Sequence, residues 1–286
     1  MPAAAYDVLL PATQSSCVVF ASPHSGRDYT WSFMRKTVLN EHAIRSSEDA
    51  FVDQLFECAP QYGATFLKAG APRAFVDLNR ARDELDPALI EGVRRIKHNP
   101  RVASGLGVIP RVVANGRAIY RGKMTLHEAE ERITDYWEPY HEKLQTLLDV
   151  AHNRHGQTVL IDCHSMPHEA MDGVLRAGMR RPDVVLGDRF GAAASGDVVD
   201  RIEAAFVRAG FVVTRNAPFA GAYITQAYGK PSKGQHAVQV EIDRSLYMNE
   251  KLIRPNGDFE KVQAALQDVV KEVALIGEGR IPLAAE

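Results

Sequence analysis

Short runs of apolar and β-branched residues alternate with longer segments of helical periodicity along most of this chain. Several of the short runs are apolar at almost every position, which is typical of strands covered on both faces. Because strands and helices alternate, we expect a three-layer α/β/α sandwich around a mixed, largely parallel sheet. The runs that predict strands are Val18–Ala21, Thr65–Leu67, Ala74–Leu78, Thr158–Asp162, Val184–Leu186, Phe211–Thr214 and Ala237–Ile242.

Four segments predict helices: Glu48–Tyr62, Thr125–His152, Gly196–Ala209 and Asp258–Ile276. The second is the clearest, because Thr125 and Glu128 form a capping box and apolar residues then recur at helical spacing. Pro139 lies inside it and is expected to kink or split the helix.

The stretch from Asn79 to Tyr120 is the least regular part of the chain and is rich in proline and glycine. A loop-rich region of this length in a compact domain is usually functional or a small insertion. There is no internal repeat and no linker that divides the chain. We therefore expect a single domain over residues 1–286, with a loop-rich insertion around 80–124.

The composition is that of an ordinary globular protein, with 45% hydrophobic residues, and the net charge of -2 argues against a nucleic-acid binder. The three cysteines, Cys17, Cys58 and Cys163, form no CxxC pair and suit a reducing compartment. The N-terminus lacks the pattern of a secretory signal, and no apolar stretch approaches the ~18 residues of a membrane span. We therefore expect a cytoplasmic protein without a membrane partner.

Two histidines, His24 and His164, each come just past one of the apolar runs. In an open α/β sheet, ligands collect outside the carboxyl ends of the strands, so the two imidazoles could share one metal ion. A catalytic zinc needs a third ligand of the same kind, and Glu48 and Asp49 lie in an acidic stretch that offers two. The alternative for either histidine alone is a structural residue with an ordinary hydrogen bond.

The run Arg73–Arg80 predicts a strand that ends in polar residues. Its alternation puts Phe75, Asp77 and Asn79 on one face, with Arg80 at or past the strand end. A guanidinium beside a carboxamide can bind a carboxylate. The alternative is an edge strand with a structural Asp–Arg pair.

Glu241 lies in an otherwise apolar run that begins at His236 and ends at Arg244. A glutamate in such a strand is costly unless it is paired or functional. Near a metal it could be the general base for water. The alternative is an exposed strand face.

Five short motifs follow one another along the chain: Pro23-His24-Ser25-Gly26, Asp77-Leu78-Asn79-Arg80, Asp162-Cys163-His164-Ser165-Met166-Pro167, Leu186-Gly187-Asp188, and Gln239-Val240-Glu241-Ile242 with Arg244 and Tyr247. In this order they resemble the N-formylglutamate amidohydrolase family. That family is similar to the zinc carboxypeptidase and aspartoacylase superfamily. The resemblance implies a zinc-carboxypeptidase-like fold over the whole chain as one amidohydrolase domain.

The resemblance implies one zinc ion with His24 and His164 as ligands. The wider superfamily takes its acidic ligand from an HxxE motif, but Arg27 occupies the position of that glutamate here. The resemblance implies that the acidic ligand comes instead from the acidic stretch that begins at Glu48. Within it we favour Asp49 as the third ligand, with Glu48 as the second choice.

The resemblance also implies the roles of four further residues. Glu241 resembles the catalytic glutamate, and Arg73 the arginine that polarises the scissile carbonyl. Asn79 and Arg80 resemble the Asn-Arg pair that binds a substrate carboxylate.

Several substrate contacts stay open at this point. A second carboxylate needs another cation, for which Arg121, Arg215 and Arg176 are candidates. Asp162 either hydrogen-bonds a ring nitrogen of a liganding histidine or points away. Tyr223, in a segment that also resembles the family, is a candidate substrate contact or a packed loop residue.

The activity implied is cleavage of the formyl amide of N-formyl-L-glutamate to L-glutamate and formate, a step of histidine degradation. One alternative is a zinc hydrolase of another N-acyl amino acid or a short peptide. Another is a non-catalytic binding protein on the same fold. The substrate is expected to be a small N-acyl acidic amino acid, and the oligomeric state is left open.

Overall fold

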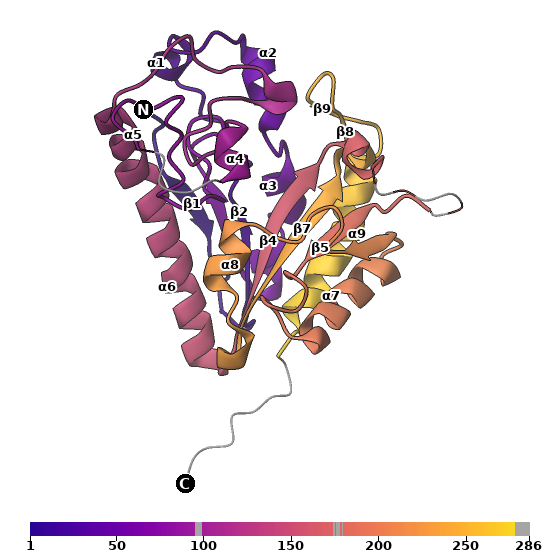
Figure 1. Ribbon diagram of the computed structural model, residues 1–286. Helices are drawn as coiled ribbons and strands as arrows, with labels where there is room; N and C mark the ends of the chain where they lie inside the picture. The colour runs from indigo at the N-terminus through magenta and orange to yellow at the C-terminus, as the bar shows by residue number, and fades with distance from the viewer. Residues whose placement is uncertain (95–98, 174, 176–177, 179, 278–286) are drawn as a thin grey trace. The chain divides into compact units, whose positions relative to one another are not determined.

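The computed structural model describes residues 1–94, 99–173, 175, 178 and 180–277 (Figure 1). The chain groups into two compact units. One comprises Met1–Asp7, Pro23–Ala50 and Lys68–Lys143, and the other Val8–Ser22, Phe51–Leu67 and Leu144–Glu286. The expectation of one amidohydrolase domain with an insertion around 80–124 stays a prediction.

A mixed sheet, with strand order β1-β3-β2-β4-β7-β5-β6, organises the second unit. β2 pairs with β4 and β4 with β7 in parallel, whereas β5 runs antiparallel to β7 and parallel to β6. Almost every residue of β2, β4 and β7 is buried, as expected for strands covered on both faces. The bounds are β1 Tyr6–Leu9, β2 Val18–Ser22, β3 Thr65–Ala69, β4 Thr158–Met166, β5 Val184–Gly187, β6 Val213–Arg215 and β7 Gln235–Asp243.

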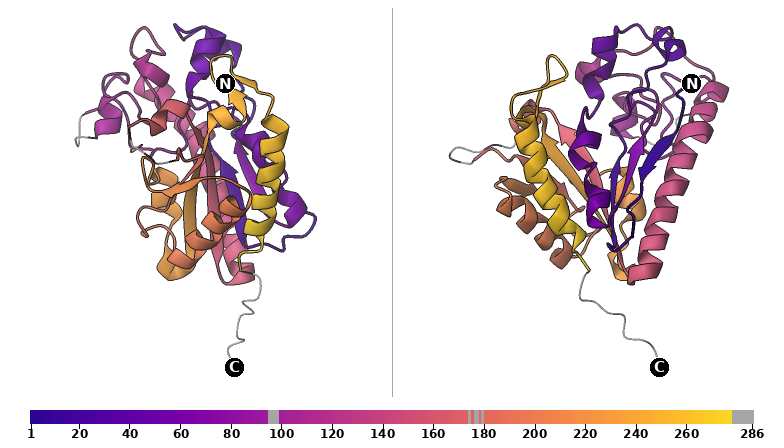
Figure 2. Two further views of the ribbon diagram at one scale, coloured as in Figure 1. Left: turned by 90° about the vertical axis from the view of Figure 1, so that its right-hand side faces the viewer. Right: turned by 180° about the vertical axis from the view of Figure 1, so that it is seen from behind.

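Helices cover both faces of this sheet, which confirms the predicted three-layer sandwich. α3 (Val52–Phe56) packs on β2 and β4, and α9 (Phe259–Ala274) packs on α3 and on α7 (Gly196–Arg208). α8 (Tyr223–Tyr228) packs on β7 and β4 from the opposite face, as the two views in Figure 2 show. The remaining elements of this unit are η2 Ala59–Tyr62, η5 His168–Met171, η6 Pro231–Lys233, η7 Arg244–Leu246, β8 Met248–Asn249 and β9 Arg254–Pro255.

The first unit consists mainly of turns and short helices. Four helices begin at a side chain that accepts a backbone hydrogen bond, namely Thr30, Asn40, Asn99 and Thr125. The elements are α1 Trp31–Met34, α2 Glu41–Ile44, η1 Arg45–Ser47, α4 Pro100–Ala103, η3 Ala114–Gly116, α5 Leu126–Arg132, η4 Ile133–Trp137 and the start of α6 Glu138–His155.

The long helix predicted from Thr125 is present, and its expected split takes the form of a π-helical turn. α5 leads into this turn, η4, and α6 continues from Glu138. Pro139 lacks the N–H that an α-helix would direct at the carbonyl of Asp135. The π-turn changes the hydrogen-bonding pattern just before the proline, so the helix continues.

The predicted strand Ala74–Leu78 is wrong. Phe75 N–H and Val76 N–H both donate to the carbonyl of Pro72, which closes a turn instead of an extended segment. The next backbone N–H group, that of Asp77, donates to the carbonyl of Val108 at 2.8 Å, and Val108 lies in a loop and not in a strand. An alternating pattern of apolar and polar residues therefore arose here without a strand.

Two further boundaries differ from the sequence pattern. The predicted helix Glu48–Tyr62 is reduced to α3 and η2, because Phe51 adopts a left-handed backbone with φ 68° just before α3. The predicted strand Phe211–Thr214 is observed as β6, two residues later at its start.

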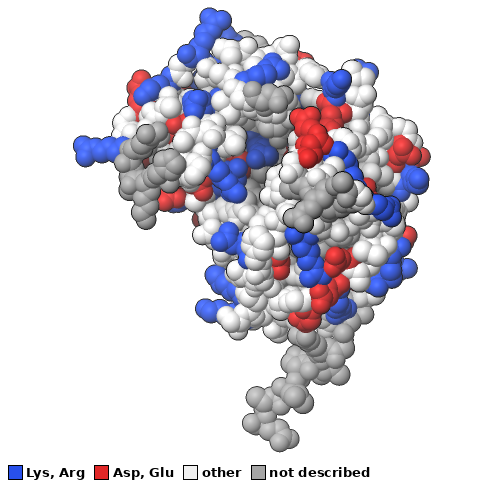
Figure 3. Space-filling view, turned by 45° about the vertical axis from the view of Figure 1, so that its right-hand side comes forward, with Lys and Arg blue, Asp and Glu red and all other residues white. Residues whose placement is uncertain are grey.

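Among the described residues, no helix is both long and apolar enough to cross a membrane. Figure 3 shows basic and acidic side chains interspersed on the face in view, in keeping with the net charge of -2.

Candidate metal centre and catalytic residues

His24 follows β2 by two residues, and carboxylates meet both nitrogens of its buried ring. Nε2 lies 2.7 Å from Asp77 Oδ1, and Nδ1 lies 3.4 Å from Asp49 Oδ2. The backbone joins the same residues, because Asp49 N–H donates to the carbonyl of His24 at 3.0 Å. A carboxylate close to Nε2 keeps the proton on that nitrogen, which leaves the Nδ1 lone pair for a metal.

Asp77 is a buried carboxylate that other groups keep ionised. Burial alone would raise its pKa, but the charges of His24, Arg73 and Arg80 hold the pKa of Asp77 well below its usual value. Arg73 Nε donates to Oδ2 at 3.1 Å, and Asn79 N–H donates to Oδ1 at 2.9 Å. Asp77 is therefore an acceptor that orients the His24 ring.

The structure separates the two candidates for the acidic ligand. Glu48 is held by Arg45, whose Nε and Nη2 donate to its two oxygens at 2.9 Å each, and by the Tyr29 hydroxyl at 3.0 Å. Asp49 instead faces His24. The preference for Asp49 over Glu48 as the third ligand stays a prediction.

His164 and Asp162 lie two residues apart on β4, so their side chains point to the same face of the sheet. His164 Nε2 lies 3.1 Å from Asp162 Oδ1, and both residues are buried. Asp162 therefore points towards the histidine and not away from it, as an ion-pair contact in which Oδ1 makes no hydrogen bond to the described residues.

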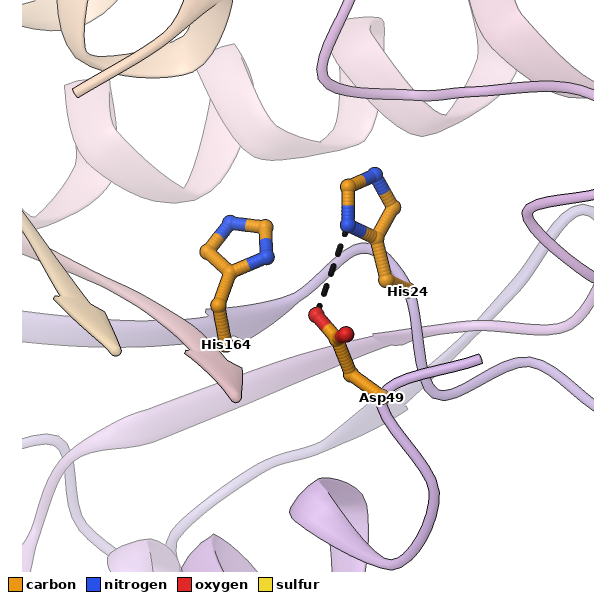
Figure 4. A group of neighbouring side chains, drawn as sticks. All are labelled: His24, Asp49 and His164. Carbon is orange, nitrogen blue, oxygen red and sulfur yellow. Dashed lines mark ion pairs between the residues drawn. The ribbon is translucent and has the colours of Figure 1, made fainter. Parts of the chain in front are cut away.

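His24, Asp49 and His164 form a buried group with the chemistry of a metal site. One possible ligand atom of each residue lies within 4.8 Å of the others, and Figure 4 shows the His164 ring beside the His24–Asp49 pair. Two imidazoles and a carboxylate are a donor set of catalytic zinc sites. Ligand atoms about 2 Å from a tetrahedral ion stand roughly 3.3 Å apart. The His24–Asp49 distance of 3.4 Å fits that arrangement.

Glu241 lies next to His164 across the parallel pairing of β4 and β7. The register aligns His164 with Glu241 and Asp162 with Gln239, so all four side chains share one face of the sheet. Gln239 Nε2 donates to Glu241 Oε1 at 2.8 Å and thereby fixes one oxygen of a buried carboxylate. The glutamate identified in an apolar run thus lies one strand away from a candidate metal ligand.

Arg80 and Asn79 follow Asp77 in the same turn-rich segment. Arg80 is buried, and it donates from Nη1 to the carbonyl of Asn79 at 2.7 Å and from Nε to the carbonyl of Leu106 at 2.9 Å. Burial lowers the pKa of its guanidinium. The Arg80 Nη2 donates no hydrogen bond to the described residues, so this end of the guanidinium can take a carboxylate.

Three side chains of the long helix hold this segment by its backbone carbonyls. Arg132 Nη1 donates to Phe75 at 3.1 Å, Trp137 Nε1 to Arg80 at 2.8 Å, and His141 Nε2 lies 2.9 Å from the Leu78 oxygen. Because burial lowers the pKa of His141 to about 4, its ring is neutral and donates from Nε2. The π-turn between Arg132 and Trp137 adds one residue to the turn and brings the donors round to one side of the helix.

The other predicted substrate contacts are spread more widely. Arg121 is exposed in the first unit, before α5. Arg215 ends β6 and forms ion pairs with Asp200 and Glu203 of α7. Tyr223 begins α8, which packs on β7 and β4. Arg176 lies outside the described residues.

Sequence reasoning missed two partners of the candidate residues. Gln239 was recognisable in principle, because residues two apart on a strand share a face with Glu241. Asp77 belonged to a recognised motif, but its contact with His24, 53 residues away, has no local signal.

Comparisons with known proteins show which family the chain belongs to. The family described as N-formylglutamate amidohydrolase matches residues 16–248. An N-formylglutamate deformylase of Pseudomonas aeruginosa is 30% identical over 274 residues, covering 92% of this chain and 94% of that protein. One from Pseudomonas putida is 29% identical over 240 residues, or 82% of each chain. A crystal structure of N-formylglutamate amidohydrolase from Ralstonia eutropha JMP134 superposes with a TM-score of 0.88 at 32% identity, covering 95% of this chain and 97% of that one. The chain belongs to the N-formylglutamate amidohydrolase family.

Proposed function

We propose that this enzyme is a zinc-dependent amidohydrolase that cleaves the formyl amide of N-formyl-L-glutamate to L-glutamate and formate. The observation that carries the proposal is the buried group of His24, Asp49 and His164, found in a chain whose curated relatives are named N-formylglutamate deformylase. The substrate is then a small molecule. The cytoplasmic location, the role in histidine degradation and the lack of nucleic-acid binding stay predictions.

The three side chains of the buried group are the proposed ligands of one zinc ion. Asp77 and Asp162 orient the two imidazoles, as carboxylates do around zinc-bound histidines. When bound, zinc acts as a Lewis acid that polarises a carbonyl and makes water acidic enough to lose a proton near pH 7.

Glu241 is the proposed general base. It lies beside His164 in the strand register, at the ~4.8 Å spacing of neighbouring strands. Its carboxylate accepts the proton of the attacking water and returns it to the leaving amine. The hydrogen bond from Gln239 fixes the position of one carboxylate oxygen of this proposed base.

Arg73, Asn79 and Arg80 are the proposed groups for the substrate's own charges. Arg73 stabilises the negative charge that develops on the formyl oxygen, as fixed cations do for an oxyanion. Asn79 and Arg80 bind one carboxylate. Arg121, Arg215 and Tyr223 are the further substrate contacts proposed from the family resemblance.

A substrate panel tests the proposal directly. Zinc-loaded enzyme is assayed with N-formyl and N-acetyl derivatives of glutamate, glutamine, aspartate and methionine, and formate or acetate release is measured. We expect formate release from N-formylglutamate to exceed that from every other compound. Preferred release from an N-acetyl compound or a peptide would favour the alternative of another N-acyl hydrolase, and no release from any would favour the binding protein.

The variant His164→Ala separates the ligand assignment from the substrate assignment. It is expected to lose both bound zinc and activity, because only two ligands remain. His168→Ala, a histidine on the same segment but outside the proposed site, is the matched control and keeps both. A His164→Ala protein that retains one zinc per chain would contradict the ligand assignment alone.

A further inference from the structure

The turn that follows β5 holds three consecutive residues in left-handed backbone conformations. The φ angle is 56° at Arg189, 56° at Phe190 and 85° at Gly191. Left-handed backbone is unfavourable for residues that carry a Cβ, and it persists only where the surrounding structure imposes it. Such strain is concentrated at functional sites in proteins, so the reason for this turn is worth tracing.

The side chain of Asn216 stabilises the turn through hydrogen bonds. Its Oδ1 accepts from Asp188 N–H at 3.1 Å and from Phe190 N–H at 3.3 Å, and its Nδ2 donates to Asp188 Oδ1 at 2.6 Å. Arg189 N–H donates to the carbonyl of Ala220 at 2.8 Å. These bonds fix both the shape of the turn and the place where the Arg189 side chain leaves it.

Arg189 packs against the segment Ala220–Gly221, which covers the face of the sheet that carries Glu241. Gly187 of β5 is paired with Gln239 of β7, so both residues face the same way as Glu241. A Cβ added to Gly187 would stand 2.7 Å from Ala220 C and from Gly221 N. Ala220 and Gly221 therefore lie directly on this face, next to the position of Gln239.

Arg189 lies on this segment with an unengaged guanidinium. Its Cγ stands 3.2 Å from where a Cβ of Gly221 would be, and the residue is half-buried. Within the part of the chain that the structure describes, its side chain makes no hydrogen bond and no ion pair, whereas Arg215 on the adjoining strand is engaged by α7. A half-buried cation without a partner gains most from an anionic ligand.

The dimensions suit the proposed substrate. Gln239, beside which this segment lies, precedes Glu241 on β7 by two residues, or about 7 Å. In N-formylglutamate the formyl carbon and the side-chain carboxyl carbon are roughly 6 Å apart when the chain is extended. A formyl group next to Glu241 thus leaves the side-chain carboxylate within the reach of an arginine on this segment.

We propose that Arg189 binds the side-chain carboxylate of the substrate and thereby selects acidic N-formyl amino acids. The inference rests on the proposed function, because it names the residue that distinguishes the substrate's side chain. The guanidinium offers two parallel N–H donors to a carboxylate, which an amide or apolar side chain cannot match.

The test compares two substrates that differ only in charge, N-formylglutamate and N-formylglutamine. For Arg189→Met we expect kcat/KM on N-formylglutamate to fall about 10- to 100-fold, mainly through KM, since a hydrogen bond to a charged group is lost. On N-formylglutamine the change stays within about threefold. Arg189→Lys keeps part of the preference. The matched control Arg201→Met, on α7 across the sheet, leaves both values unchanged.

An equal loss on both substrates, or no loss on N-formylglutamate, overturns the inference. Arg189→Gly is the second variant in case Arg189→Met folds poorly, because glycine relieves the left-handed strain while it removes the cation. Its thermal midpoint should equal or exceed that of the wild type, with the same loss of selectivity.

A binding measurement keeps this inference separate from the proposed function. The wild type and Arg189→Met are titrated with L-glutamate and with L-glutamine in a calorimeter. Weaker binding of L-glutamate alone by the variant supports the role of Arg189. Equal binding by the two proteins, or no binding of L-glutamate to the wild type, overturns it. A wild type that releases no formate from N-formylglutamate overturns the proposed function and leaves the calorimetric result to decide on Arg189.

Discussion

The β4–β7 pair and the segment from Arg73 to Arg80 both carry candidate chemistry, but they are held in place by different means. In the strand pair, backbone register alone sets His164 beside Glu241. In the segment, no strand exists, and side chains of the long helix fix the backbone carbonyls. The strand pair therefore needs no particular neighbour to keep its geometry, whereas the segment depends on donors more than 50 residues away. Substitutions should expose this difference.

The largest effect is expected in the strand pair, at Glu241. Glu241→Gln keeps the shape of the side chain but cannot accept a proton, so kcat should fall by ~10²-fold or more. The strand pairing is untouched, so zinc content and thermal midpoint should match the wild type. Glu169→Gln, an exposed glutamate after β4, serves as the control. Near-normal turnover by Glu241→Gln would remove Glu241 as the base.

The second prediction concerns pH and the helix that holds the segment. Burial lowers the pKa of His141 to about 4, below the 6.5 of an exposed histidine. As the pH falls from 6.5 towards 4, the unfolded chain takes up a proton that the folded chain refuses, so the free energy of unfolding decreases. The full difference amounts to about 3 kcal/mol at this one site.

The variant His141→Gln, which can still donate to the Leu78 carbonyl but does not titrate, isolates that contribution. Urea unfolding of the two proteins between pH 7 and 4.5 should show a smaller loss for the variant. Parallel stability curves would mean that His141 is not held neutral.

The third prediction tests the link from the segment to the metal group. Asp77→Asn keeps the shape of the side chain but removes the charge that orients His24. Loss of a carboxylate partner of a liganding histidine lowers metal affinity by 10- to 100-fold in known sites, and a fall of about that size is expected here. Competition of each protein with a zinc chelator measures it. Unchanged zinc affinity would show that the Asp77–His24 contact does not tune the site.

The smallest effect is expected at Arg80. Arg80→Ala should raise KM for N-formylglutamate by about tenfold, with kcat changed far less, because ground-state binding of a carboxylate is lost. Arg82→Ala, an exposed arginine two residues on that pairs with Glu138, is the matched control. A fall in kcat at constant KM would place the role of Arg80 elsewhere.

The contrast between the β4–β7 pair and the Arg73–Arg80 segment also explains which features could be predicted from the sequence. The strands of the sandwich were predictable because neighbouring residues such as Val159 and Leu160, which point to opposite faces of the sheet, are both buried. Burial on both faces gives each strand an almost wholly apolar composition. His164 and Glu241 could be found because each stands out as polar in such a strand.

The Arg73–Arg80 segment shows why the rest was not predictable. Its alternating pattern is that of a strand, but Pro72 closes a turn and His141 and Trp137 supply the hydrogen bonds that a neighbouring strand would supply. These partners are far along the chain, and no local pattern specifies them. Arg189 escaped notice for a related reason, because the left-handed turn that presents it is imposed by the distant Asn216.

The central claim is that His24, Asp49 and His164 hold one metal ion on which amide hydrolysis depends. The most direct measurement is formate release from N-formylglutamate while metal-free wild-type enzyme is titrated with zinc. The account predicts that activity rises linearly and reaches its plateau at about one equivalent of zinc per chain. Full activity in the metal-free enzyme, or no recovery on addition of zinc, would contradict it.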